Sequence, residues 1–188
     1  MSASSVISDV TLTLEELLKS EQRPANFFDV SLKSPADEAV EAGMTPKVNL
    51  FLYRVAENAF AKNQEKQALG PNILEYPPLW LNLFFLLTPF AEDKLDEFRV
   101  LGEAMRVLHD NSIVPGAALK GSLENTGEEL HVHLSLYALE QVTQIWSALD
   151  KSYRLSVCYE VRTMFIDSLI QLPVSRVLEV DTRFSQLP

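Results

Sequence analysis

The sequence has little cysteine and little glycine. Cys158 is its one cysteine, so an internal disulfide, a disulfide scaffold and a multi-cysteine metal site are excluded. We predict that this side chain is a small buried hydrophobe. The six glycines never form a phosphate-binding loop or a dinucleotide fingerprint. No cofactor is therefore expected.

Positive charge is also scarce. Lys and Arg total 16 against 26 Asp and Glu, which gives a formal net charge of -10, and the cations are scattered singly. Such a surface repels a phosphate backbone, so no nucleic acid partner is expected. The N-terminus, MSASSVISDV, has no basic region ahead of an apolar core, which predicts neither a secretory signal nor a membrane anchor. We expect a protein that is made and assembled in the cytoplasm.

The most apolar segment is PPLWLNLFFLLTPF, Pro77 to Phe90. Its apolar run, Leu79 to Leu87, is about half of the ~20 residues that a membrane-spanning helix needs, so no direct membrane insertion is expected. Alternate side chains of this run point to opposite faces, and both faces are largely apolar. This pattern is typical of a central strand covered on both sides. Pro89 is predicted to end the strand, where a missing main-chain donor does least harm.

Periodicity predicts the other elements. Apolar residues three and four positions apart predict helices over 4–20, 93–109 and 138–149. Alternation predicts strands over 26–32, 48–55 and 153–166 and a hairpin within 111–136. In the second of these strands Val55 shares a face with Phe51 and Tyr53, and in the last one Phe165 faces inward. The polar stretch 56–72 is interpreted as a connection or a short helix ending in a turn.

Some of the predicted strands are connected directly, as in a hairpin, and others are connected through a helix. We therefore predict a mixed α/β (α+β) fold, in which helices pack on a mixed central β-sheet. One domain is expected over residues 1–170. Residues 171–188 lack a long period and are predicted to form a C-terminal arm.

Residues with catalytic or metal-binding chemistry are few. His131 and His133 stand two apart on one strand face, but no nearby Cys or His completes a tetrahedral ligand set. No serine lies in a Gly-x-Ser-x-Gly turn, and Cys158 has no visible base beside it. We predict no catalytic residues, no metal site and no enzyme. A small cytoplasmic enzyme remains an alternative, because hydrolytic sites also form without local motifs.

Four stretches, taken together, resemble one known family. They are VNLFLYRVAENAFAKN at 48–63, PPLWLNLFFLLTPF at 77–90, LGEAMRVLHDN at 101–111 and LEQVTQIWSALDKSYRLSVCYEVRTMFIDS at 139–168. Their order and spacing are similar to those of the tail-terminator, or cap, proteins of extracellular contractile injection systems. These phage-tail-like particles are related to the antifeeding prophage and the Photorhabdus virulence cassettes. The resemblance covers most of the chain, from about residue 4 to 170.

The resemblance implies a structural function and a fold like that of the tail terminators of contractile phages. It implies a homo-hexameric ring on the last layer of inner tube and sheath, which ends polymerisation and holds the sheath extended. The partners implied are the sheath protein and the inner tube protein, in a particle that is assembled in the cytoplasm and then released or retained. An adaptor or baseplate component of the same particle is the alternative within this class.

Related sheaths exchange terminal arms that add strands to an adjacent sheet, and the resemblance makes residues 171–188 the candidate arm. An added strand would cover unpaired edges that otherwise invite further growth. An alternative is that this segment returns over the core of its own chain. The residues predicted to contact the partner are Val174, Arg176, Val177, Leu178, Val180 and Arg183.

Overall fold

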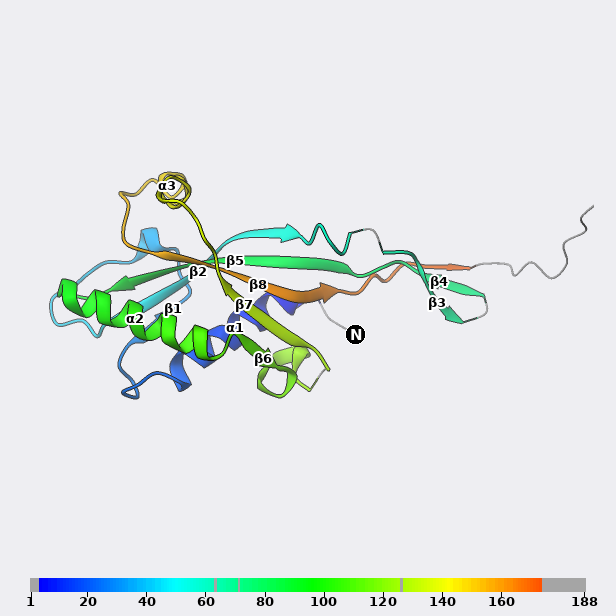
Figure 1. Cartoon of the computed structure of the whole chain (residues 1–188), viewed down its shortest axis with the longest axis horizontal. Coiled ribbons are helices and arrows are strands. Elements are labelled where there is room, and N and C mark those ends of the chain that lie inside the picture. The colour runs from blue at the N-terminus through cyan, green and yellow to red at the C-terminus, as the bar shows by residue number, and fades with distance from the viewer. Residues whose placement is uncertain (1–3, 63, 71, 126, 174–188) are drawn as a thin grey trace, which may run out of the picture.

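The structure is a computed structural model that describes residues 4–62, 64–70, 72–125 and 127–173. The predicted mixed α/β architecture is present: a central sheet with helices on both of its faces (Figure 1). Within these residues no helix is long and apolar enough to cross a membrane.

A six-stranded sheet forms the centre of the molecule. Strand β1 pairs with β2 in parallel, and every other neighbouring pair is antiparallel. The order across the sheet is β1 (Asp29–Ser31), β2 (Lys47–Glu57), β5 (Leu79–Phe90), β8 (Val157–Ile166), β7 (Glu129–Leu134) and β6 (Ile113–Pro115). The two outermost strands are only three residues long, so they cover only part of their neighbours.

Two long helices cover one face of this sheet. The predicted helices are confirmed as α1 (Val6–Ser20) and α2 (Lys94–Asp110), both on the same side (Figure 1). The side chain of Asp93 caps α2, because its Oδ1 accepts the N–H of Leu95 at 2.6 Å. The helices pack on the sheet through positions that recur every three or four residues: Val6, Val10, Leu14 and Leu18 of α1, and Val100, Ala104, Val107 and Leu108 of α2.

The third helix lies on the opposite face. It is α3 (Leu139–Ala148), and it covers one end of that face (Figure 1). Leu86 of β5 packs under it with Val142, Trp146 and Cys158. Strand β5 is therefore buried on both faces, as its double-sided apolar pattern predicts. The prediction that Cys158 is a buried hydrophobe is also confirmed.

A second, smaller sheet lies at the far end of the long strands (Figure 1). It consists of β3 (Gln67–Gly70), β4 (Ile73–Glu75) and β9 (Gln171–Pro173). The interpretation of 56–72 as a connection or short helix is wrong where β3 forms. The short β3 pairs with β4, and β4 pairs in turn with β9. The pairing with β9 joins segments that are far apart in the chain, so it leaves no period in the sequence.

Two β-bulges change which face some side chains occupy. In β2 the register shifts between Leu52 and Arg54, so Arg54 lies opposite Phe84, and Val55 moves to the α1/α2 face. In β8 the register shifts before Met164, which enters the main core in place of Phe165. The ring of Phe165 instead packs against Trp80 at 4.8 Å. The predicted faces of Val55 and Phe165 are therefore wrong, since one extra residue reverses the alternation.

Pro89 lies inside β5 rather than at its end. It pairs with Val48 of β2, while the pairing of β5 with β8 stops at Leu87 and Val157. The missing N–H is tolerated because β8 has ended on the other side at this point.

Candidate functional site

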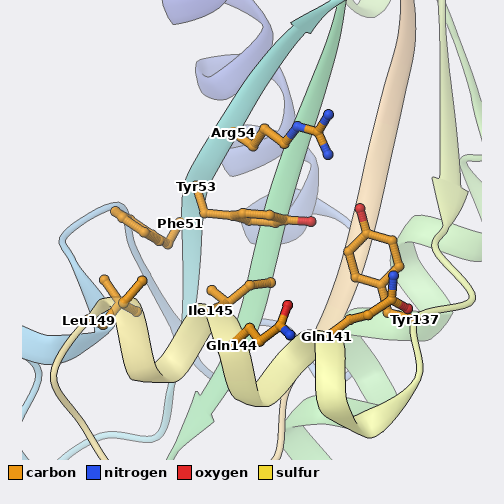
Figure 2. A pocket seen from close by; sticks show the side chains of 9 residues that line it. Phe51, Tyr53, Arg54, Tyr137, Gln141, Gln144, Ile145 and Leu149 are labelled. Carbon is orange, nitrogen blue, oxygen red and sulfur yellow. The ribbon is translucent and has the colours of Figure 1, made fainter.

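A groove lies between β2 and α3 on the α3 face of the sheet (Figure 2). Its volume is about 440 Å³. The lining is mostly apolar or uncharged, and Arg54 is its charged member. The groove is lined by Phe51, Tyr53, Arg54, Tyr137, Gln141, Gln144, Ile145, Ala148 and Leu149.

The bulge in β2 builds the sheet side of this groove. Because of the extra residue, the consecutive side chains of Tyr53 and Arg54 both line it. Arg54 lies over the ring of Phe84, with the guanidinium carbon 5.0 Å from the ring centroid. This contact holds the cation at the sheet surface while the guanidinium still meets solvent.

The hydroxyl of Tyr53 points across the groove toward Tyr137 (Figure 2). Its oxygen is buried, and it has no hydrogen-bond partner among the residues that the structure describes. Burial raises the pKa of Tyr53 well above its usual range, so this phenol stays protonated. The hydroxyl of Tyr137 and the thiol of Cys158 are its polar neighbours and also raise this pKa.

Helix α3 is held in place by a buried side chain. Trp146 is 1% exposed, and its Nε1–H donates to Ser156 Oγ at 3.0 Å. Ser156 Oγ donates in turn to the main-chain oxygen of Arg154, also at 3.0 Å. At the start of the helix the N–H of Ala138 donates to Gln141 Oε1 at 2.9 Å. These contacts hold one wall of the groove against the sheet.

The rest of the α3 face carries a row of polar side chains across the strands. Asn58 Nδ2 donates to Asn82 Oδ1 at 3.0 Å, and Asn82 Nδ2 donates to Glu160 Oε1 at 2.8 Å. Arg162 Nη2 donates to the other oxygen of Glu160 at 2.7 Å. Each member has a partner of opposite hydrogen-bonding character, so the row is a satisfied network.

The two histidines of β7 lie on the same face. Their rings are 6.1 Å apart, and His131 Nε2 lies 3.0 Å from Glu129 Oε1. Within the described ranges no group of three or more His, Cys, Asp or Glu is placed to hold a metal ion. The predicted solvated strand face agrees with the exposure of His133.

The outer edge of β2 is open along most of its length. Strand β1 pairs only with Lys47–Asn49, whereas β2 continues to Glu57. No other strand in the described part of the chain pairs with this edge. Residues 50–57 are called the open edge of β2 below.

Hydrogen bonding on the inner side shows which main-chain groups face outward. The N–H of Asn58 donates to Trp80 O of β5 at 2.9 Å. Because main-chain groups alternate along a strand, Val55 and Glu57 direct their N–H and C=O away from β5. The open edge therefore presents hydrogen-bonding groups next to the groove.

The predicted partner-binding residues of the arm all lie outside the described residues. They are Val174, Arg176, Val177, Leu178, Val180 and Arg183. The first residues of the arm are described: β9 pairs with β4, with Leu172 opposite Leu74. Sequence reasoning missed the groove and the open edge. The helical spacing of Ile145 and Leu149 predicts one wall, but neither the bulge nor the shortness of β1 has a recognisable sequence signal.

Comparison with known proteins adds a family and a fold. The family model described as the Pvc16 N-terminal domain matches residues 9–179. The fold is similar to the sheath/tube terminator of the PVC extracellular contractile injection system in its extended state, with a TM-score of 0.66 and 16% sequence identity. That match covers 100% of this chain and 66% of the other.

The tube-terminating cap of the anti-feeding prophage is also similar. Its TM-score is 0.59 at 16% identity, and the match covers 94% of this chain and 61% of the cap. This chain thus spans less than two thirds of the length of either structure. No curated protein sequence matches it. The tail-terminator-like fold predicted from the sequence is confirmed.

Proposed function

The chain belongs to the family of the Pvc16 N-terminal domain, and from this premise we propose that it is a cap of a contractile injection particle. In this function it terminates the sheath and the inner tube of a phage-tail-like particle. The observation that carries the proposal is the likeness to a sheath/tube terminator over 100% of this chain. A structural role, and not catalysis, is what both similar structures have in their own particles.

The proposed cap is a homo-hexameric ring on the last layer of tube and sheath. It ends polymerisation because it covers the strand edges to which a further layer would add. It holds the sheath extended until firing, which requires subunits that resist deformation. The double burial of β5 supports this role, since a central strand packed on both faces gives a stiff platform.

The proposed arm, residues 171–188, links neighbouring subunits by adding a strand. Its expected contacts are Val174, Arg176, Val177, Leu178, Val180 and Arg183. The arm starts with β9, so its first residues already form a paired strand in the small sheet at the far end of the molecule (Figure 1). Assembly of the ring in the cytoplasm, before any release of the particle, belongs to the same proposal.

Electron microscopy of particles tests the cap function. Particles are purified from cells with the chain, without it, and with it restored, and the lengths of extended sheaths are measured. We expect one length when the chain is present, and absent, contracted or variable-length particles when it is missing. Particles of unchanged length and state in its absence would overturn the proposal.

The position of the chain on the particle separates a cap from a baseplate component. A tag on residue 1 is located with gold-labelled antibody on intact particles. We expect the label at the end away from the baseplate. Label at the baseplate end would instead support an adaptor.

A further inference from the structure

The open edge of β2 and the groove under α3 form one continuous surface. Phe51, Tyr53 and Arg54 belong to the strand that carries the edge and also line the groove. An extended segment added to this edge would hydrogen-bond to β2 and place alternate side chains beside the groove. Two independent features therefore fit the same kind of occupant, an extended peptide with alternating apolar side chains.

We propose that the open edge of β2 accepts residues 174–188 of a neighbouring copy of this chain as an added strand. This inference rests on the proposed function, in which copies stand side by side in a ring. It assigns to this chain the acceptor site as well as the donated strand.

The open edge of β2 has the properties that strand addition requires. Strand β2 pairs with β5 along nearly its whole length, so the strand is held extended while its outer side stays open. Val55 is 43% exposed at this edge. Natural proteins usually blunt a long open edge or cover it. The one charged side chain of the groove, Arg54, is turned onto the ring of Phe84 and leaves the edge accessible.

The sequence of the C-terminal segment fits this site. In LEVDTRF, residues 178–184, the apolar Leu178, Val180 and Phe184 alternate with charged residues. Such alternation is typical of a half-buried strand. The apolar set would face Phe51 and the apolar wall of α3, while Glu179, Asp181 and Arg183 would face away from the groove.

The length and starting point of the segment favour a neighbouring copy. At about 3.3 Å per residue, residues 174–188 span roughly 50 Å when extended, more than the open edge requires. They start from β9, at the far end of the molecule from α3 (Figure 1). Strand β8 already leads the chain toward that end, so a return to the open edge of its own chain would require the segment to reverse direction.

Site-directed crosslinking between two full-length chains tests the proposal. One chain carries Asp181→Cys, because Asp181 in the added strand would lie on the same face as Val55. A second chain with a different tag carries Val55→Cys. The matched control carries Ile113→Cys, an apolar residue of similar exposure on the strand at the opposite edge of the sheet, 53% against 43%. Native Cys158 is buried and stays in every chain. A short bis-maleimide is added to the mixed chains and to particles that contain them.

We expect a mixed-tag crosslinked dimer with Val55→Cys and little with Ile113→Cys. Three results would each overturn the inference. Two are the absence of a dimer at Val55 and equal dimer yields at both positions. The third is measured on a chain that carries both engineered cysteines, and it is a crosslink that forms only within that chain. Particle length is measured on the same samples. Normal length without the crosslink rejects the acceptor site alone, whereas particles of unchanged length in cells that lack the chain reject the proposed function.

A proline at the edge tests the hydrogen bonding itself. The N–H of Val55 faces outward, so Val55→Pro removes an edge donor without removing a bond to β5. The crosslink from Asp181→Cys is repeated at Glu57→Cys, which lies on the same face as Val55, in Val55→Pro and Val55→Thr backgrounds. We expect Val55→Pro to lower the dimer yield about fivefold or more, as the loss of one hydrogen bond and a steric block predict, and Val55→Thr to retain it. Equal yields from both folded variants would contradict strand addition.

Discussion

Asp9 and Ser122, 113 residues apart in the sequence, are joined by two hydrogen bonds to one oxygen atom. The N–H of Ser122 lies 3.0 Å from Asp9 Oδ2, and its Oγ lies 2.6 Å from the same atom. Ser5 Oγ donates to this oxygen at 2.8 Å. The carboxylate is 6% exposed. It fixes the short helix η3 (Gly121–Leu123) to α1, and so holds the connection between β6 and β7 against the helical layer.

Asp9→Ala should destabilise the folded chain by about 2–4 kcal/mol. The substitution leaves the N–H and Oγ of the half-buried Ser122 without the buried Asp9 oxygen that accepts from them. Urea unfolding measures the change. Glu16→Ala is the matched control, because Glu16 is an exposed carboxylate on the same helix and its loss should change stability by less than about 0.5 kcal/mol. Equal losses in both variants would contradict a special role for Asp9.

The same carboxylate should make stability depend on pH. Burial alone would raise the pKa of Asp9, but hydrogen bonds from Ser122 and Ser5 outweigh burial and lower it below its ordinary value of 3.8. Its stabilising contribution is therefore present above that pH and is lost as the pH falls through the lower pKa of the folded state. Urea unfolding between pH 6 and pH 2 should show a steep loss for the natural chain.

Asp9→Asn separates this contribution from those of other carboxylates. Glu38 and Glu103 also have lowered pKa values, and they remain in the variant. We expect the stability difference between the natural chain and Asp9→Asn to shrink as the pH falls below 3.8. A difference that stays constant across this range would contradict the assignment.

Substitution of alanine for two glycines should change the stability of the folded chain in opposite directions. Gly121 has a φ of 65°, and an added Cβ would lie much closer to Asp9 Oδ1 than van der Waals contact allows. Gly102 lies inside α2, and an added Cβ there would meet nothing within 4 Å. We expect Gly121→Ala to destabilise the chain by at least about 1–2 kcal/mol and Gly102→Ala to stabilise it by up to about 1 kcal/mol. Thermal unfolding of both variants checks the two signs.

The elements that sequence reasoning predicted are those whose burial is local and periodic. Helix α2 shows its buried face at every turn, and β5 shows apolar residues on both faces, so both could be predicted. The small sheet of β3, β4 and β9 could not, because its strands are short and one of them comes from the other end of the domain. Pairing of this kind depends on tertiary context rather than on local pattern.

The candidate site was beyond sequence reasoning for a related reason. The face occupied by Val55 depends on a single extra residue in β2, and no residue type between Leu52 and Arg54 marks that bulge. The open edge depends on where β1 stops, which is a property of the partner strand. The family, in contrast, was recognised from four stretches in register, each of which is mainly core.

Cys158 should be inert to thiol reagents in the native protein. It is 2% exposed under α3, and burial raises its pKa, so very little reactive thiolate reaches solvent. We expect a maleimide to label it only after denaturation, as mass spectrometry of the intact chain would show. An engineered cysteine at Ile113, which is 53% exposed, provides the positive control. Rapid native labelling of Cys158 would mean that α3 opens from the sheet.

Tyr53→Phe should leave the isolated chain unchanged in stability or stabilise it by up to about 1 kcal/mol. The hydroxyl is buried and has no well-formed hydrogen bond among the described residues, and Tyr137 and Cys158 are only weak partners, so its removal chiefly abolishes a desolvation cost. Ser156→Ala is the contrasting variant, because Ser156 Oγ accepts from Trp146 Nε1 and donates to Arg154 O. We expect that variant to lose about 1–2 kcal/mol, and urea unfolding measures both.

The same pair of variants reports on the groove. The Tyr53 hydroxyl points toward Tyr137 and away from the open edge, so Tyr53→Phe should leave association between copies unchanged. Ser156→Ala should lower the stability of each copy and also leave association unchanged, since its hydroxyl lies under α3 and away from the groove lining. Light scattering across a concentration series measures association. A Tyr53→Phe chain that is destabilised as much as Ser156→Ala would instead mean that the Tyr53 hydroxyl makes a stabilising bond across the groove, to Tyr137 or Cys158. Association that falls with Tyr53→Phe would mean that the groove itself, and not only the open edge, contacts the neighbouring copy.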